Sequence, residues 1–454
     1  MKCKILFGIR AKFILELLRL YNGGFTLLGD KCQAIYDYQS EEMSSKKFYE
    51  TFAYIFDNMK EIEYKEQKRL KYSTNEKAIL LRNAIESTNS TIIENVVEQV
   101  WNSIQEVHME DLKKGAILTK MNGTVYNISN GLNIEHRILE NKNNIYYEDW
   151  VGYIFGDYTN DFIDKYKFQN IIFNKLGIEG SECQKYWNYC KKIEGTENEE
   201  IDVKKLHRNL ILAYNEADEI TEKNEELVIS TIHKAKGKEF ENVYIDESVR
   251  VLAKNKDLIN YAKMLYVAIT RAKNKCYKIN CESEKNNEYY AKIKGEERYL
   301  EWHNKRFNRG KGKTKRSITK IEIGLENDIE KTSFINDRIV GDAVKNIEYI
   351  KHEVKKGDYV DLKLENDDYY IYHNQIKIGK MNIGDLYARA QISFNKVSRM
   401  TFKPPRYLHV RVKRKQTIAM FQEFIPSEIE NVYSKTGIWI GIELEGFGKL
   451  DWDK

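Results

Sequence analysis

The stretch Ile229–Phe240, which reads ISTIHKAKGKEF, combines residue types that suit phosphate binding. It places the hydroxyl of Thr231, the imidazole of His233, several lysines and Gly237 after an apolar segment expected to be a strand. Hydroxyls, basic side chains and main-chain N–H groups are the usual donors to a nucleic-acid backbone. Glu239 adds an acceptor suited to a ribose hydroxyl. The alternative is a solvated lysine-rich loop, which the patterned succession of residue types disfavours.

A second stretch, Leu27–Tyr38 (LLGDKCQAIYDY), begins with an apolar segment, Phe25–Leu28, that is expected to be a strand. Open α/β sheets bind ligands at the carboxyl ends of their strands, where the Gly-Asp pair stands. The amide of Gln33 can hydrogen-bond a phosphate oxygen or a water, and Tyr36 and Tyr38 can stack on bases. Taken alone, the stretch is equally compatible with a strand–turn–helix segment that carries surface tyrosines.

A third stretch, Met264–Lys273 (MLYVAITRAK), has apolar residues that would anchor a helix in a core. Arg271, near the end of that helix, is expected to project into a cleft. A guanidinium there can stabilise charge on a transferred phosphoryl group. The ordinary alternative is a capping or surface arginine.

Taken in chain order, Leu27–Tyr38, Ile229–Phe240 and Met264–Lys273 resemble motifs III, V and VI of the UvrD/Rep-like superfamily 1 DNA helicases. The resemblance covers residues 10–40 and 225–280, is looser between them, and brings no motif beyond residue 300. It implies ATP-driven movement along single-stranded DNA by two RecA-like lobes that close on ATP, with affinity that falls as salt rises.

The resemblance also implies roles for individual residues. Gln33 would sense the γ-phosphate, and Arg271 would be the arginine finger. The remaining assignments are nucleotide contacts at Gly237 and Glu239, and DNA contacts at Tyr36, Tyr38, Thr231 and His233.

Motif IV is not settled by the sequence. The family carries an arginine there that meets the γ-phosphate, and the corresponding stretch here is Lys68–Thr74 (KRLKYST). Arg69 or Lys71 could supply the charge, although a lysine cannot reproduce the bidentate fork of an arginine. Both assignments stay open.

The sequence contains no phosphate-binding loop of the form GxxxxGK[ST]. Gly310–Thr314 (GKGKT) comes near it, but Phe307 stands where the first glycine belongs. Val243–Glu247 (VYIDE) resembles an acidic Walker B strand, yet it directly follows the motif V stretch and is expected to be an ordinary strand end. ATP and Mg²⁺ are expected for the family, whereas the full site is not encoded in this chain and no metal ligand is predicted. The hypothesis is that the isolated chain does not hydrolyse ATP.

The predicted fold class is α/β, with an incomplete first RecA-like lobe, a second RecA-like lobe with a helical insertion, and a small, mostly-β C-terminal domain. Short strands are expected at 227–231, 243–245 and 276–279, and a helix at 257–272. The expected organisation assigns residues 1–88 to the remnant of the first lobe (with the start of motif IV), 89–300 to the second lobe, 301–320 to a basic linker and 321–454 to the β-rich domain.

The composition excludes some classes of protein but does not identify a function. The 454 residues are 42% hydrophobic and carry a net charge of only +5, so bulk charge does not identify a partner. No apolar run is long enough for a membrane span, and the six cysteines form no CxxC pair, so a cytoplasmic protein without membrane contact or a zinc site is expected. Basic residues 411 and 413–415 either contact phosphates or protect a strand edge.

The leading hypothesis is the C-terminal part of a UvrD-like ATP-dependent helicase, as a truncated or split gene product. Its expected partners are single-stranded or partly duplex DNA and, for a split enzyme, a separate chain that supplies the P-loop lobe. The split form requires an exposed apolar face near the N-terminus. The alternatives are a non-catalytic single-stranded nucleic-acid-binding or regulatory module, and an inert remnant.

Overall fold

The computed structural model divides the chain into two compact units. Unit 1 comprises residues 1–140 and 225–284, and unit 2 comprises residues 141–224 and 285–454. The residues that the structure describes are 8–21, 23–26, 28–35, 45–56, 60, 72–132, 134–139, 146–212, 227–251, 258–280, 288–296, 298–306, 314–395 and 402–452.

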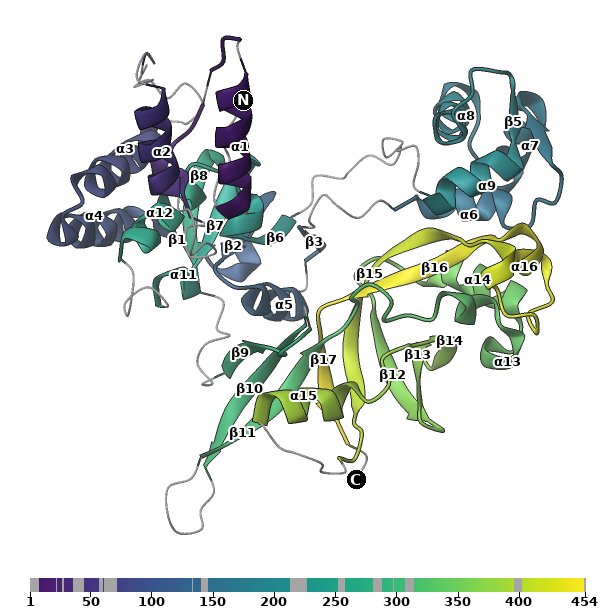
Figure 1. Ribbon diagram of the computed structural model, residues 1–454. Helices are drawn as coiled ribbons and strands as arrows, with labels where there is room; N and C mark the ends of the chain where they lie inside the picture. The colour runs from purple at the N-terminus through teal and green to yellow at the C-terminus, as the bar shows by residue number, and fades with distance from the viewer. Residues whose placement is uncertain are drawn as a thin grey trace. The chain divides into compact units, whose positions relative to one another are not determined.

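Unit 1 is built on a parallel sheet of six strands in the order β1-β8-β7-β2-β6-β3 (Figure 1). The strands are β1 (Gln105–Glu106), β2 (Gly115–Thr119), β3 (His136–Ile138), β6 (Leu227–Thr231), β7 (Phe240–Asp246) and β8 (Ala272–Ile279). The strands expected at 227–231, 243–245 and 276–279 are therefore confirmed, and the α/β class with them.

Alternate side chains of the central strand β2 enter two different cores. Ala116 and Leu118 pack in the core that includes α3 (Tyr72–Ser87), α4 (Ser90–Ser103) and α12 (Leu258–Ile269). Ile117 packs on the opposite face against residues of α5 (Asn122–Gly131). Because parallel strands carry helices on both faces, all five residues of β2 are buried. The sequence accordingly reads as a continuous apolar run rather than an alternating one.

The helix α12 is the central element of the larger core. Tyr261, Ala262 and every residue from Met264 to Ile269 are buried, so the helix is apolar all round. Such a helix belongs inside a core rather than on a surface. It confirms the helix expected at 257–272 and places the motif VI stretch beside the sheet.

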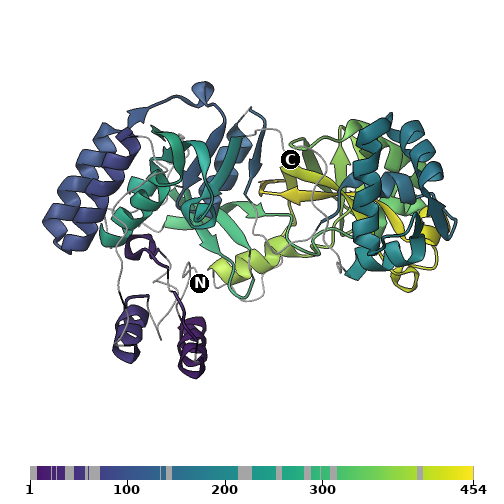
Figure 2. The same cartoon turned by 90° about the horizontal axis from the view of Figure 1, so that it is seen from above.

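The N-terminal elements of unit 1 form a small core of their own. Helix α1 (Gly8–Leu20) packs against α2 (Ser45–Ile55), the two purple helices of Figure 2, through Ala11, Leu15, Phe48 and Phe52. The strand expected at 25–28 is not found among the described residues there, where Leu28 makes a single bridge. The segment instead leads into a short 3-10 helix, η1 (Lys31–Gln33), whose N-cap is Asp30.

Unit 2 combines a helical part with an antiparallel sheet. The helical part contains α6 (Asp149–Phe155), α7 (Lys165–Leu176), α8 (Gly180–Glu194) and α9 (Val203–Leu212). It also contains a two-stranded sheet of β4 (Phe162–Asp164) and β5 (Glu200–Asp202). The backbone of α6 lies directly on the sheet: a Cβ at Gly152 would come within 2.9 Å of the Trp439 carbonyl oxygen. The Gly152 N–H donates to Thr417 Oγ1 at 2.8 Å. The helical insertion therefore belongs with the β-rich part and not, as expected, with the second lobe.

The antiparallel sheet of unit 2 has nine strands, with β14-β13-β12-β15-β17-β11-β10-β9 in order and β16 paired to β15. They are β9 (Glu288–Lys292), β10 (Tyr299–Arg306), β11 (Thr314–Glu322), β12 (Tyr359–Glu365), β13 (Asp368–His373), β14 (Ile376–Lys380), β15 (Arg406–Ala419), β16 (Ile438–Glu445) and β17 (Phe447–Asp451). The remaining elements are η4 (Lys331–Ile335), α13 (Asp337–Val340), α14 (Ala343–Glu353), α15 (Leu386–Asn395), η5 (Gln422–Phe424) and α16 (Val432–Thr436).

The basic linker expected at 301–320 is wrong for the described part of that range. Residues 301–306 lie in β10 and residues 314–320 lie in β11, and the two strands pair with each other. The charges misled the prediction, because Leu300, Ile318 and Ile321 are buried and hold the strands in the core.

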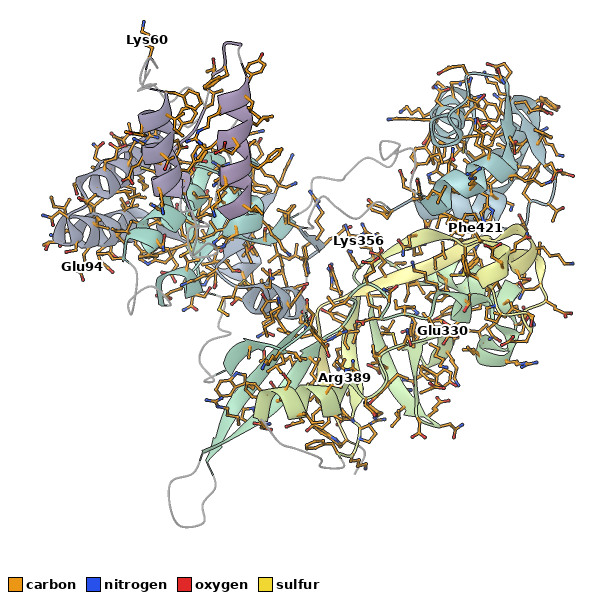
Figure 3. All side chains as sticks on the ribbon, in the orientation of Figure 1. Lys60, Glu94, Glu330, Lys356, Arg389 and Phe421 are labelled. Carbon is orange, nitrogen blue, oxygen red and sulfur yellow. The ribbon has the colours of Figure 1, made fainter. Side chains whose placement is uncertain are left out.

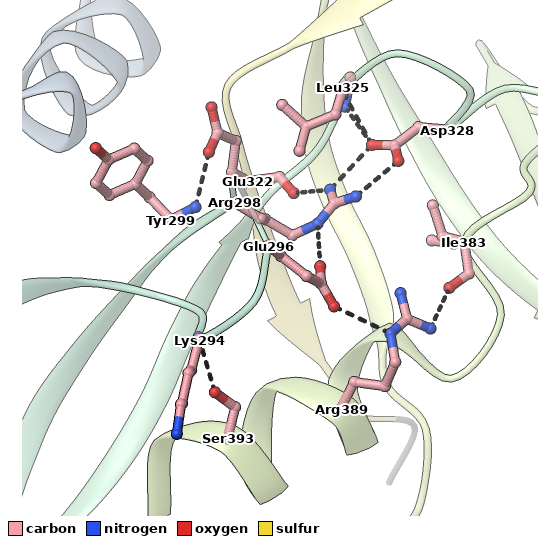
Figure 4. A network of polar contacts seen from close by, with 11 residues as sticks. Lys294, Glu296, Arg298, Tyr299, Glu322, Leu325, Asp328, Ile383, Arg389 and Ser393 are labelled. Atoms are coloured by element: carbon pink, nitrogen blue, oxygen red, sulfur yellow. Dashed lines mark hydrogen bonds and ion pairs between the residues drawn. The ribbon is translucent and has the colours of Figure 1, made fainter. Parts of the chain in front are cut away.

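A buried arginine joins the two ends of this hairpin (Figure 4). Arg298 donates to both carboxylate oxygens of Asp328, at 2.9 and 2.7 Å, and to the main-chain oxygen of Glu322 at 2.5 Å. Its Nε also donates to Glu296, which accepts a second bond from Arg389 of α15, labelled in Figure 3. The start of β10 and the end of β11 are therefore held together by charged hydrogen bonds in a dry environment.

The basic residues of β15 are engaged in ion pairs. Arg411 lies 2.5 Å from Glu445, and both Lys413 and Arg414 lie 2.8 Å from Glu443. The strand pairs with β12, β16 and β17, so it is not a sheet edge. The edge-protection interpretation of these residues is wrong, and Arg411, Lys413 and Arg414 are engaged with two carboxylates within unit 2.

Among the helices that the structure describes, none combines the length and the apolar composition needed to cross a membrane.

Candidate functional site

The motif III stretch forms a polar turn around the carboxylate of Asp30. Asp30 Oδ1 accepts from the Cys32 N–H at 3.0 Å, and Oδ2 accepts from Gln33 Nε2 at 2.9 Å. Two residues from other elements reach the same carboxylate. Arg82 of α3 lies 2.8 Å from Oδ1, and the Tyr266 hydroxyl of α12 donates to Oδ2 at 3.0 Å. Asp30 thus joins the stretch to two helices of the larger core.

The same turn is also bound by the motif V stretch. Lys236 Nζ donates to the Gln33 carbonyl oxygen at 2.6 Å. His233 Nε2 lies 3.2 Å from the Ile35 carbonyl oxygen, so this nitrogen carries the proton. The two stretches lie about two hundred residues apart in the sequence and contact each other through main-chain carbonyl groups of the turn.

Burial and charge shift the titration of the residues around Asp30. Burial lowers the pKa of Arg82, but the neighbouring Asp30 carboxylate outweighs this effect and leaves the pKa raised. Burial, with the charge of Asp30 adding to it, raises the pKa of the Tyr266 hydroxyl. The same two causes raise the pKa of the Cys32 thiol to about 11. At neutral pH, Arg82 is therefore a cation while Tyr266 and Cys32 are uncharged.

The guanidinium of Arg82 also lies 5.9 Å from the centre of the Tyr266 ring. A cation over an aromatic face gains a further attraction. Arg82 is thereby held by a carboxylate on one side and a ring on the other, next to Gln33.

His233 is uncharged over a wider range than a free histidine. Its burial is the largest cause of a lowered pKa, the bond to the Ile35 carbonyl opposes it, and the charges of Lys120 and Lys236 add to it. A neutral His233 matches its role as a donor to a carbonyl.

The structure places Arg271 differently from the sequence expectation. It is 4% exposed rather than projecting into a cleft. Its Nε donates to the Val267 carbonyl at 3.1 Å, Nη1 to the Lys238 carbonyl at 3.2 Å and Nη2 to Thr270 Oγ1 at 3.2 Å. In this conformation the guanidinium joins α12 to the start of β7.

The other motif V residues occupy the turn after β6. Thr231 is 5% exposed, and its hydroxyl accepts from the Lys234 N–H at 3.3 Å at the start of α10 (Ile232–Ala235). Gly237 has φ +85°, a conformation that favours glycine, and it is exposed together with Glu239. The turn presents main-chain groups, while Thr231 itself contributes to the local fold.

The acidic end of β7 behaves as an ordinary strand end. Asp246 is 2% exposed, and its carboxylate accepts from the Ser248 N–H at 3.1 Å. The Asp30 carboxylate is likewise occupied by side-chain and main-chain donors. The described residues contain no group of three or more His, Cys, Asp or Glu side chains that could hold a metal ion. The described residues around this turn therefore do not fit an Mg²⁺ site.

Four of the predicted residues lie outside the described residues: Tyr36, Tyr38, Arg69 and Lys71. Three residues of the observed site were not predicted: Arg82, Lys236 as a contact to Gln33, and Tyr266. A signal was available for Arg82, because a cation directly after the apolar Ile79–Leu81 of a helix indicates a buried partner.

Residues 226–278 match the family described as UvrD-like helicase C-terminal domain. The matched segment runs from β6 through β7 and α12 into β8, and it contains His233, Lys236, Tyr266 and Arg271. No curated protein matches the chain.

Proposed function

We propose that unit 1 contains the second RecA-like lobe of a UvrD-like DNA helicase, together with the motif III segment of the first lobe, and binds single-stranded DNA at the turn after β6. The observation that carries the proposal is the docking of the motif III turn on the motif V segment and α12, within the segment that matches the helicase domain. Helicase motifs act together at one site, and these residues lie together although they are distant in sequence.

In this proposal Asp30 controls the position of Gln33. The side-chain amide of Gln33 donates to Asp30 and its main-chain carbonyl accepts from Lys236, so both the side chain and the backbone of this residue are held. A γ-phosphate near this turn would compete with Asp30 for the amide donors of Gln33. This competition would change the contacts that Tyr266 and His233 make with the turn. The presence or absence of the γ-phosphate would thereby alter the conformation of the turn that is proposed to contact DNA.

Two arginines are candidates for the cation that faces the phosphate. Arg271 would have to leave its three hydrogen bonds to reach a nucleotide. Arg82 already stands beside Gln33 and keeps about a quarter of its side chain exposed, at 26%. We assign Arg82 the motif IV role that the sequence left open and keep Arg271 as the arginine finger that moves when the site closes.

An apolar stripe on α1 supports the expectation of a partner that brings the P-loop lobe. Ile9, Phe13, Leu17 and Leu20 are 79%, 66%, 50% and 81% exposed. Helical spacing places all four on one side, while Ala11 and Leu15 on the other side are buried. A helix that is apolar on both sides is normally covered on both. We propose that the remainder of a first RecA-like lobe, with its P-loop, covers this stripe.

The DNA proposal is tested by fluorescence anisotropy with a labelled oligothymidine and no nucleotide. Binding should weaken as salt rises, and His233→Gln should weaken it about tenfold, which corresponds to about 1.4 kcal/mol. Thr231→Val should weaken it as well, while the exposed His108→Gln should not. Equal affinity of all four proteins would refute the assignment.

The partner proposal has a separate test. A first-lobe polypeptide with a P-loop should restore DNA-stimulated ATP hydrolysis to residues 1–454. Phe13→Lys together with Leu17→Lys should prevent the restoration. Phe162→Lys with Phe173→Lys is the matched control, since these two residues of unit 2 are 53% and 52% exposed. Restoration by both double variants would exclude the α1 stripe as the docking face.

A second function, a non-catalytic single-stranded DNA-binding module, is favoured by the lack of an Mg²⁺ ligand group among the described residues. The two functions differ in one measurement. The module should bind DNA with an affinity that ATP does not change, whereas the helicase lobe should change its DNA affinity when a first lobe and ATP are added together.

A further inference from the structure

Helix α7 of unit 2, labelled in Figure 1, has one buried side and one exposed side. Phe168 and Ile172 are completely buried in the core of the helical part. Tyr166 and Phe173, by contrast, are 75% and 52% exposed. These two residues are seven positions apart, so they lie on the same side of the helix, about 10 Å apart along its axis. The helix therefore presents a pair of aromatic rings to the solvent.

The side chains around these two rings are polar or basic. Asn170 is exposed, and it lies between the rings because it comes four residues after Tyr166 and three before Phe173. Lys165 and Lys167 stand on either side of Tyr166 in the sequence, and α7 itself contains no Asp or Glu. An amide can hydrogen-bond the edge of a base, and an ammonium group can contact a phosphate.

The acidic residues that precede the helix are engaged with other groups. Asp157 lies 2.5 Å from Lys175, and Asp161 lies 2.9 Å from Lys204. Asp164 is the N-cap of α7, and its carboxylate accepts a main-chain N–H of the first turn. Two of these three carboxylates are thus neutralised by lysines, and the two lysines that flank the first ring outnumber the third. The exposed side of α7 therefore favours an anionic ligand.

The segment that carries the rings is held at both ends. The Tyr158 hydroxyl donates to the Phe162 carbonyl at 2.8 Å, and Lys167 Nζ lies 5.2 Å from the centre of the Tyr158 ring. At the other end, Gly177 has φ +68°, and its N–H donates to the Phe173 carbonyl at 2.8 Å. A rigid support lowers the entropic cost of presenting side chains to a ligand.

The exposed apolar residues of α7 differ in kind from those of the α1 stripe. Three of the four exposed residues of that stripe, Ile9, Leu17 and Leu20, are aliphatic. The exposed apolar residues of α7 are both aromatic, because its aliphatic residues are buried or partly buried against the core. Aliphatic side chains fill a protein interface but cannot stack on bases. Aromatic rings accompanied by basic residues are the usual composition of a surface that binds single strands.

We propose that the exposed side of α7 binds single-stranded nucleic acid, with bases stacked on Tyr166 and Phe173. This site lies on unit 2 and is additional to the one proposed for the turn after β6 in unit 1. Lys165 and Lys167 contact the phosphates, and the amide of Asn170 hydrogen-bonds a base between the two rings. Because every base has a face on which a ring can stack, the site tolerates any sequence.

The test is fluorescence anisotropy with labelled oligothymidine and residues 1–454, without nucleotide. Tyr166→Leu together with Phe173→Leu removes both rings but keeps apolar side chains that favour a helix. This variant should bind about 30-fold more weakly, which corresponds to about 2 kcal/mol for two stacking contacts. Tyr166→Trp with Phe173→Trp should bind at least as tightly as the unchanged protein. The control, Tyr359→Leu with Phe424→Leu, replaces the same residue types at positions of unit 2 that are 39% and 68% exposed, and it should leave binding unchanged.

Unchanged affinity of the double-leucine variant of α7 would overturn the proposal, and so would an equal loss for a blunt-ended duplex, whose bases are already stacked on one another. The loss should persist when the variant also carries His233→Gln, so failure of the unit 1 site and failure of this one give different results. Phe162→Lys with Phe173→Lys, the control of the partner test, removes one of these rings and is therefore compared at saturating single-stranded DNA. Circular dichroism of each variant establishes that it is folded.

Discussion

The ion pair between Asp30 and Arg82 should couple the motif III turn to α3 far more strongly than a surface pair does. The two charged groups lie 2.8 Å apart, with 19% and 26% of their side chains exposed. Unit charges about 4 Å apart attract by about 4 kcal/mol at an effective dielectric constant of about 20 and by about 1 kcal/mol in water. Partial desolvation of both groups opposes this attraction. We therefore expect a coupling energy of about 2 kcal/mol.

A double-mutant cycle with Asp30→Asn and Arg82→Gln measures this coupling. The readout is hydrogen exchange of the amides of residues 28–35, where a coupling of about 2 kcal/mol corresponds to about 30-fold in protection. The control cycle uses Glu16→Gln and Arg19→Gln, a pair at a similar 2.7 Å but with side chains 64% and 49% exposed. Surface pairs contribute about 0 to 1 kcal/mol. Equal coupling in the two cycles would refute the argument that burial strengthens the Asp30 contact.

The remaining predictions concern pH and packing. His233 has a pKa lowered by burial, so docking of the motif III turn should be fully stable above about pH 6.5 and weaken as the pH falls. Protection of the amides of residues 28–35 from hydrogen exchange should show this loss. His233→Gln should abolish the pH dependence, and His207→Gln should leave it unchanged. Gly152→Ala should destabilise unit 2 by about 1 to 3 kcal/mol in urea, because its Cβ meets the Trp439 backbone, whereas Gly131→Ala, with nothing within 4 Å, should leave unit 1 unchanged or slightly more stable. Asp328→Asn should cost about 3 to 5 kcal/mol in the same urea experiment, because it removes the carboxylate that accepts two hydrogen bonds from the buried guanidinium of Arg298. A cost below 1 kcal/mol for Asp328→Asn would contradict the view that this pair anchors the hairpin.

The core of unit 1 could be predicted because its sequence pattern is set by local physics. Leu227–Ile229 of β6 and Met264–Ile269 of α12 are buried apolar runs, and such runs indicate strands and helices covered on both sides. The three motifs could be found for the same reason, since each combines an apolar anchor with polar residues at its end. The family match at residues 226–278 covers the stretches Ile229–Phe240 and Met264–Lys273.

Contacts between distant segments could not be predicted from the sequence. Nothing near Arg82 in the sequence indicates that Asp30 is its partner, because the pairing depends on how α3 and the motif III turn pack. The hairpin of β10 and β11 was missed because its charges hide the burial of Leu300 and Ile321. The grouping of the helical insertion with the sheet of unit 2 depends on the close approach at Gly152, for which a lone glycine in a helix is a weak signal.

The most direct test of the account is ATP turnover by purified residues 1–454, measured with and without single-stranded DNA. The account predicts binding of the DNA but no turnover above background in either case, because residues 1–454 contain no phosphate-binding loop to complete the proposed second-lobe site. Turnover that DNA stimulates and Arg271→Ala abolishes would contradict it.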